Sequence, residues 1–201
     1  MTEEQENLLV PMKDYLKAGI HIGTKFKNKF MMPFIYRIRP DGLSVLNLQA
    51  IDERLDIAGK FMANYNPEEI LVVCRRENGW KVIKKFSDVT GTKAYPGRYP
   101  PGILTNPSLK NYVEVKLLMV VDSWPDRNAI NDAKKKGISI IGLCDTNNNF
   151  NNIDLVIPAN NKGKSSLALI FYILAKEYLK NRGKIKSDEE LGATLEDFMA
   201  E

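Results

Sequence analysis

Two kinds of apolar pattern alternate along this chain. Short apolar runs indicate strands buried on both faces, whereas longer stretches with apolar residues at steps of three and four indicate amphipathic helices. The segments that predict strands are residues 43–48, 70–74, 93–95, 117–121, 138–143 and 153–157. The segments that predict helices are residues 10–17, 51–65, 78–90, 125–136 and 167–178.

Strands separated by longer helical stretches are typical of βαβ crossovers, which join parallel strands. We therefore expect an α/β fold: a single doubly wound domain on a mainly parallel five-stranded sheet, with helices on both faces. The domain is predicted to span residues 11–183, between an acidic N-terminal extension at residues 1–10 and an acidic C-terminal tail at residues 184–201. A ligand of such a domain is expected at the carboxyl edge of the sheet.

Charge is distributed unevenly along the chain, whose formal net charge is +4. Acidic residues contribute −3 within residues 1–10 and −6 within residues 187–201, which leaves +13 for residues 11–186. Such an excess on a compact domain favours a polyanionic partner. A membrane surface is disfavoured, because no predicted helix combines a basic polar face with an exposed apolar one.

Residue types that support catalysis or metal binding are sparse. His21 is the only histidine, and it stands in a glycine-flanked turn with no cysteine nearby, where a hydrogen bond that fixes the turn is its expected role. Asp122 and Asp145 follow predicted strands, but each precedes a turn-forming Ser or Thr, which favours a cap or turn role. We therefore expect no enzymatic activity, no cofactor and no metal.

The sequence shows no signal of secretion or membrane insertion. Its first residues are acidic, and no apolar run approaches the length of a transmembrane helix. Cys74 and Cys144 lie in or at the end of apolar runs, where a free thiol packs as a small hydrophobic group. These observations predict a protein of the reducing cytoplasm.

One loop has the pattern of an anion site. Residues 158–166 connect the last predicted strand to the last predicted helix, and a helix N-terminus attracts anions through its free N–H groups and its dipole. Asparagines and lysines crowd this position. The residues that we predict as phosphate contacts are Asn160, Asn161, Lys162 and Lys164.

Three hypotheses compete for this loop. Gly163-Lys164-Ser165 copies the end of the nucleoside triphosphate motif, but Pro158 stands in place of the first glycine and has no N–H to offer. Alternatively, the lysines are solvated and Asn160 or Ser165 is an ordinary N-cap. We favour the third hypothesis, in which the anion is a backbone phosphate of a nucleic acid.

A second candidate site is a basic and aromatic segment between the first predicted helix and the first predicted strand. Arg98, followed by Tyr99, is a further candidate as a clamp for an unstacked base or ribose, although a rigid Pro-Gly segment more commonly packs. Two other lysine runs, residues 84–85 and 134–136, lie on predicted helix surfaces and are expected to be solvated. The predicted phosphate contacts in the basic segment are Lys25, Lys27, Lys29, Arg37 and Arg39.

Several motifs are informative only when taken together. In chain order they are Ala18-Gly19-Ile20-His21-Ile22-Gly23-Thr24, Tyr36-Arg37-Ile38-Arg39 with Asp41-Gly42, Gly97-Arg98-Tyr99-Pro100-Pro101-Gly102, Leu104-Thr105-Asn106-Pro107, Asp145-Thr146 and Ile157-Pro158-Ala159-Asn160-Asn161-Lys162-Gly163. The set resembles the universal small-subunit ribosomal protein number two family, in its archaeal and eukaryotic branch. Two dipeptides depart from the family pattern, Glu114-Val115 and Asp122-Ser123, because the family has proline at the second position of each.

The resemblance implies a non-enzymatic protein of the small ribosomal subunit with a parallel α/β sheet as its body. Its implied partners are small-subunit ribosomal RNA and neighbouring ribosomal proteins, with no membrane and no small-molecule substrate. It also implies an archaeal source, since the helical insertion of bacterial members is absent and the acidic tail is short. In this function, lysines and arginines release counterions from RNA phosphates, while asparagines and backbone N–H groups fix the orientation.

Two other functions remain as alternatives. A phosphate-ligand enzyme, such as a sugar-phosphate isomerase or a nucleotide-dependent enzyme, would use the same carboxyl-edge crevice. A protein-binding scaffold would keep its basic surface for solubility alone.

Overall fold

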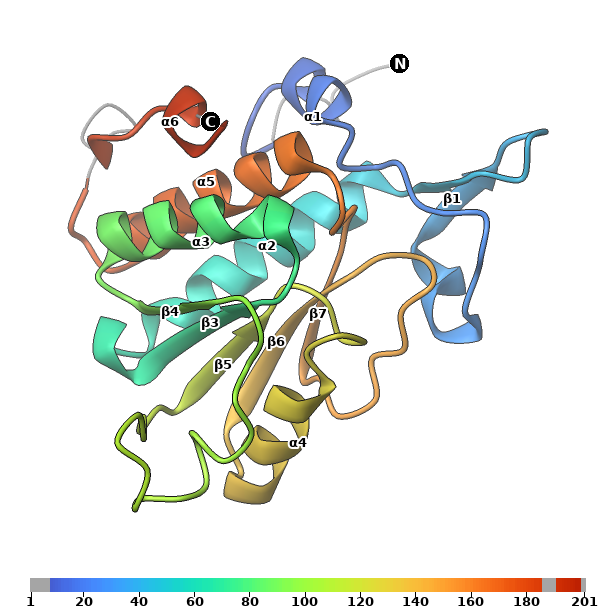
Figure 1. Cartoon of the computed structure of the whole chain (residues 1–201). Coiled ribbons are helices and arrows are strands. Elements are labelled where there is room, and N and C mark those ends of the chain that lie inside the picture. The colour runs from blue at the N-terminus through green and yellow to red at the C-terminus, as the bar shows by residue number, and fades with distance from the viewer. Residues whose placement is uncertain (1–7, 186–190, 200–201) are drawn as a thin grey trace.

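A five-stranded parallel sheet forms the centre of the structure (Figure 1). The computed structural model describes residues 8–185 and 191–199. The strand order is β4-β3-β5-β6-β7, and every neighbouring pair is parallel, which confirms the predicted sheet. The strands are β3 (Ile70–Cys74), β4 (Lys93–Pro96), β5 (Leu117–Val120), β6 (Ser139–Cys144) and β7 (Leu155–Pro158).

Helices cover both faces of this sheet, as expected for a doubly wound domain. Three helices, α2, α3 and α5, pack on one face, and α4 packs on the other. The chain order places α3 between β3 and β4 and α4 between β5 and β6. The helices are α1 (Met12–Ala18), η1 (Lys29–Phe34), α2 (Leu48–Ala63), η2 (Pro67–Glu69), α3 (Glu77–Thr90), α4 (Arg127–Lys136), α5 (Lys164–Asn181) and α6 (Leu195–Met199).

The face under α4 is completed by a loop. Residues 97–116 connect β4 to β5 without a helix, and they bury Tyr99, Ile103 and Leu104 in the same cluster as α4. Loop side chains therefore replace the second helix that would otherwise cover this face.

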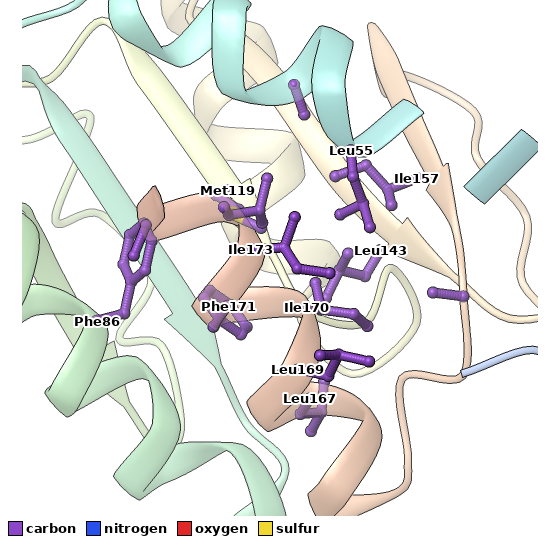
Figure 2. Close-up of a cluster of buried hydrophobic side chains, with 14 of the residues drawn as sticks. Leu55, Phe86, Met119, Leu143, Ile157, Leu167, Leu169, Ile170, Phe171 and Ile173 are labelled. Atoms are coloured by element: carbon purple, nitrogen blue, oxygen red, sulfur yellow. The ribbon is translucent and has the colours of Figure 1, made fainter. Parts of the chain in front are cut away.

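The helix α5 is enclosed on nearly all sides. It lies between α2 and α3 over the sheet, and it also contacts α1 and α6. Figure 2 shows Leu167, Ile170 and Ile173 of this helix among buried side chains of the sheet and α2. Phe171 meets Phe86 of α3 edge to face, with 5.2 Å between the ring centroids. This packing fixes the N-terminus of α5 at the carboxyl edge of the sheet.

A two-stranded antiparallel hairpin stands apart from the main sheet. It consists of β1 (Ile35–Ile38) and β2 (Ser44–Leu46). The segment at residues 43–48 is therefore a strand, as predicted, but it pairs with β1 and does not join the parallel sheet. The apolar pattern misses β1 because three of its four side chains are exposed.

Both ends of the described chain pack on the helical layer. The backbone N–H of Leu9 donates to the Asp52 carboxylate of α2 at 3.0 Å. At the other end, Phe198 of α6 is buried and its ring centroid lies 6.0 Å from that of Tyr172. The rest of the expected acidic extension and tail, residues 1–7, 186–190 and 200–201, lies outside the described residues.

The helices α2 and α5 approach each other closely at Gly59. A Cβ atom added at Gly59 would lie 2.5 Å from the Cβ of Glu177 on α5, and both residues are buried. Because the core is already close-packed, a side chain at this position has to push the two helices apart.

We predict that Gly59→Ala lowers the free energy of unfolding by roughly 1–3 kcal/mol, measured by urea denaturation. In an ordinary helix interior the same change stabilises the protein by about 1 kcal/mol. Destabilisation by Gly59→Ala would therefore show that the close approach of α2 and α5 outweighs helix propensity. The control is Lys60→Ala at the next, exposed position, which should change stability by less than about 0.5 kcal/mol. A stabilised Gly59→Ala variant would contradict the close approach.

Candidate functional site

A buried hydrogen-bond network joins the loops at the carboxyl edge of the sheet. The Asn148 side-chain oxygen accepts from the backbone N–H of Asp145 at 2.8 Å and from the Asn161 amide at 3.0 Å. The Asn148 amide nitrogen donates to Asp122 at 2.8 Å. Because these residues follow β6, β7 and β5 respectively, one asparagine links three loops.

Two ion pairs complete this network. Arg76, after β3, donates to the Asp122 carboxylate through Nε at 2.7 Å. Lys162 Nζ lies 2.6 Å from Asp145 Oδ2 and also donates to the Asn147 side chain at 3.0 Å. Both carboxylates are almost completely buried, and a buried carboxylate is costly unless it is paired and hydrogen-bonded. The ammonium group of Lys162 is thus engaged in intramolecular contacts with Asp145 and Asn147.

The asparagines of the loop before α5 are also used internally. The Asn160 side-chain oxygen accepts from the backbone N–H groups of Lys162 at 3.0 Å and Gly163 at 3.2 Å. Its amide donates to the Gly19 carbonyl at 3.2 Å, and the fully buried Asn161 donates to the Leu143 carbonyl at 3.3 Å. These contacts shape the loop and occupy two N–H groups that the anion hypothesis offers to a phosphate. The N-cap of α5 is Gly163, so neither Asn160 nor Ser165 has that role.

The early basic segment lies beside the loop after β6. The backbone N–H groups of Thr24 and Asn28 donate to the Thr146 hydroxyl and carbonyl at 2.9 and 2.8 Å. Gly23 allows this approach, because a Cβ there would lie 2.5 Å from the Thr146 methyl carbon. The three lysines held at this position are exposed, and none of them forms an ion pair with a described residue: Lys25, Lys27 and Lys29.

The remaining predicted cations occupy two other places. Arg37 lies on β1 and Arg39 directly follows this strand in the hairpin; both are exposed, and Arg39 lies 3.7 Å from Asp41. Arg98 is exposed on the loop after β4. Tyr99 is buried and donates its hydroxyl to Asp132 at 3.2 Å, so the hypothesis that Tyr99 and Arg98 together clamp a base or ribose is wrong.

The apolar pattern overlooks several polar or aromatic residues at this edge. Arg75 and Arg76 directly follow β3, while Trp124 and Arg127 follow β5, and Arg75, Trp124 and Arg127 are exposed. Arg75 and Arg76 stand immediately after an apolar run, and this position is the signal that identifies them, since strand ends in a parallel sheet meet at one edge.

Burial holds two titratable groups, His21 and Cys74, in their neutral forms. Burial lowers the pKa of His21, whose Nδ1 is buried and has no hydrogen-bond partner among the described residues. Burial raises the pKa of Cys74 to about 12, so its thiol is protonated and unreactive at neutral pH. No group of three or more His, Cys, Asp or Glu side chains arranged for metal binding occurs in the described part of the chain. Nor does any described helix have the length and apolarity to cross a bilayer.

The sequence matches the family model described as "Ribosomal protein S2" over residues 15–116 and 108–180. The chain belongs to the ribosomal protein S2 family. It is 54% identical over 190 residues to the small ribosomal subunit protein uS2 of Nanoarchaeum equitans, with 94% of each chain covered. It is 50% identical over 194 residues to the protein of that name from Picrophilus torridus, with 96% of this chain and 97% of the relative covered.

A third relative, uS2 of Thermoplasma acidophilum, is 47% identical over 196 residues, with 98% of both chains covered. These relatives are archaeal, which confirms the resemblance to the archaeal branch of the family. Members of this family are structural components and not enzymes, so the expectation of no enzymatic activity is also confirmed.

We predict that Lys162→Met lowers the free energy of unfolding by about 2–3 kcal/mol at neutral pH, because it leaves the buried Asp145 carboxylate without its cation. Lys164→Met is the matched control two residues away, where no ion pair forms with a described residue, and it should cost less than about 0.5 kcal/mol. Urea denaturation of both variants measures the difference. Equally small effects would contradict the structural role of Lys162.

Asp126 provides a prediction for the pH dependence of stability. Burial raises the pKa of Asp126 to about 7, and only one of its oxygens is hydrogen-bonded, to the backbone N–H of Arg75 at 3.3 Å. Since this pKa is higher in the folded state, protonation stabilises the fold at low pH, and the contribution is lost as the pH rises through about 7.

We expect the wild-type protein to lose about 1 kcal/mol more stability than Asp126→Asn between about pH 6 and about pH 8. The comparison uses the difference between the two unfolding profiles, so the contribution of His21, which is present in both proteins, cancels. Parallel profiles would show that Asp126 does not titrate in this range.

Proposed function

We propose that this protein is a structural component of the small ribosomal subunit in the cytoplasm, where it binds ribosomal RNA and neighbouring ribosomal proteins through its basic surface. Relatives that match more than nine-tenths of the chain carry the name of a small-subunit protein, which supports this assignment. The basic surface consists of the exposed cations of the carboxyl edge and the hairpin.

The separation of charges at the carboxyl edge is the observation that carries the proposal. Acidic side chains lie underneath, since Asp122, Asp126 and Asp145 are each about 1% exposed, whereas the cations that are not paired with them, such as Lys25, Arg75 and Arg127, are exposed. An RNA backbone approaching this edge therefore meets positive charge, and each neutralised phosphate releases condensed counterions. The proposed phosphate contacts are Lys25, Lys27, Lys29, Arg37, Arg39, Arg98 and Lys164, together with Arg75 and Arg127.

The other predicted residues receive a positioning role in this proposal. Asn160, Asn161 and Lys162 bond to the protein itself, so we propose that they hold the loop before α5 in shape beside the RNA. The loop then contributes Lys164 and the start of α5 as the elements that face a phosphate.

We predict that replacing Lys25, Lys27 and Lys29 together by Gln weakens binding to a small-subunit ribosomal RNA transcript. If each lysine neutralises one phosphate, the slope of log K against log salt should become shallower by about 2–3. Filter binding between about 50 and 200 mM salt measures both quantities.

Three lysines at the opposite edge of the sheet provide the matched control. Lys134, Lys135 and Lys136 are exposed at the C-terminal end of α4, and their replacement by Gln removes the same charge. The salt slope of this variant should stay close to that of the wild type. Equal reductions in both triple variants would indicate attraction by net charge alone, and a wild-type protein that neither binds the RNA nor sediments with small subunits would refute the proposed function.

A further inference from the structure

A hollow at the carboxyl edge is lined by aromatic rings and amides. It has a volume of about 470 Å³ and lies between the loops after β5 and β6 and the basic segment at residues 24–28. Phe26 and Trp124 border it with side chains that are 80% and 75% exposed. Exposure of this extent is unfavourable for large apolar rings, and neither ring stacks on another ring of the described chain.

Both rings are carried on backbone that is fixed from below. The N–H of Trp124 donates to Asp122 Oδ1 at 3.1 Å, and the same oxygen accepts from the buried Asn148 amide. The carbonyl of Phe26 accepts from the Thr146 hydroxyl at 3.0 Å. The backbone of both residues is therefore hydrogen-bonded to the same buried network. A ligand that binds between the rings needs little further ordering of this backbone.

The rest of the lining is polar and basic. Amide side chains come from the loop after β6, as with Asn149, and from α4, as with Asn131, and Arg127 of α4 adds a cation. Lys25 and Lys27 flank Phe26 in the sequence and are exposed. Ile130 is the single aliphatic residue of the lining, and it is almost fully buried. Amides that donate and accept, rings that stack and cations at the rim match an unpaired nucleotide better than an apolar protein segment.

We infer that this hollow binds one unstacked base of the ribosomal RNA, with Trp124 and Phe26 as the stacking surfaces and the neighbouring asparagine amides bonded to the base edge. Arg127 and Lys25 contact the flanking phosphates. This inference rests on the proposed RNA-binding function and adds to it a site for a single exposed nucleotide.

The decisive variant is Trp124→Ala, tested on the full chain with a small-subunit ribosomal RNA transcript. Loss of one stacking surface should weaken binding about 5- to 100-fold. The salt slope should not change, because no charge is removed. Trp124→Phe keeps an aromatic face and should bind within about threefold of the wild type. Since the ring is exposed, all variants should keep the wild-type circular dichroism spectrum and melting temperature.

Fluorescence gives an independent readout at the ring itself. Trp80 is the other tryptophan of the sequence, and Trp80→Phe leaves Trp124 as the only indole. Stacking of a base on this indole should quench its emission when the transcript is added, with a midpoint that follows the binding curve. Emission that is insensitive to saturating RNA would overturn the inference.

These experiments distinguish failure of the base site from failure of the proposed RNA-binding function. If the wild type shows no salt-dependent RNA binding, the proposed function fails. If the wild type binds with the expected slope but Trp124→Ala binds equally well, only the base site fails, and the exposed ring is then a contact for a neighbouring protein. Weaker binding with an unchanged slope and a quenched Trp124 supports the base site.

Discussion

The buried hydrogen bonds of Asn148 hold together the part of the molecule on which function depends. One amide side chain bonds to the loop after β5 and to those on either side of β7, and it does so beneath the surface where water cannot substitute. Polar groups in such a position stabilise one arrangement because every alternative leaves a donor or acceptor unpaired. The geometry of the carboxyl edge is therefore specified from inside the protein.

The same network explains how a basic edge can be built from a sequence that also carries aspartates there. Asp122 and Asp145 are buried, and Arg76 and Lys162 neutralise their charges in ion pairs. Their carboxylates are therefore not exposed at the surface of this edge. Other cations of this edge, such as Lys25, Lys27 and Arg127, are exposed and form no ion pair with a described residue. Because the aspartates are buried and cations are exposed, this edge is basic although the net charge of the chain is modest.

Packing and polar bonding contribute to different parts of this design. The helix α5 fixes the layers through apolar contacts with α2, α3 and the sheet, and its N-terminus arrives at the edge as a consequence. The loops at that edge are then held by hydrogen bonds to the side chains of Asn148 and Asn160. The family departure at Ser123 falls in one of these loops, where it precedes the exposed Trp124 without disturbing the bond that Asp122 makes to Asn148.

The sequence by itself determined the parallel sheet, the helices on both faces and the family, because apolar periodicity and ordered motifs are local properties of the chain. It also placed the basic segment and the loop before α5. It did not determine the roles of individual residues: Asn161 and Lys162 look like ligands in sequence, yet the fold buries one and pairs the other with Asp145. The hairpin strand β1 and the hollow that Phe26 and Trp124 both line also became visible only in three dimensions. Each depends on which distant segments lie side by side, and that is decided by burial and long-range hydrogen bonding, which leave no periodic signal along the chain.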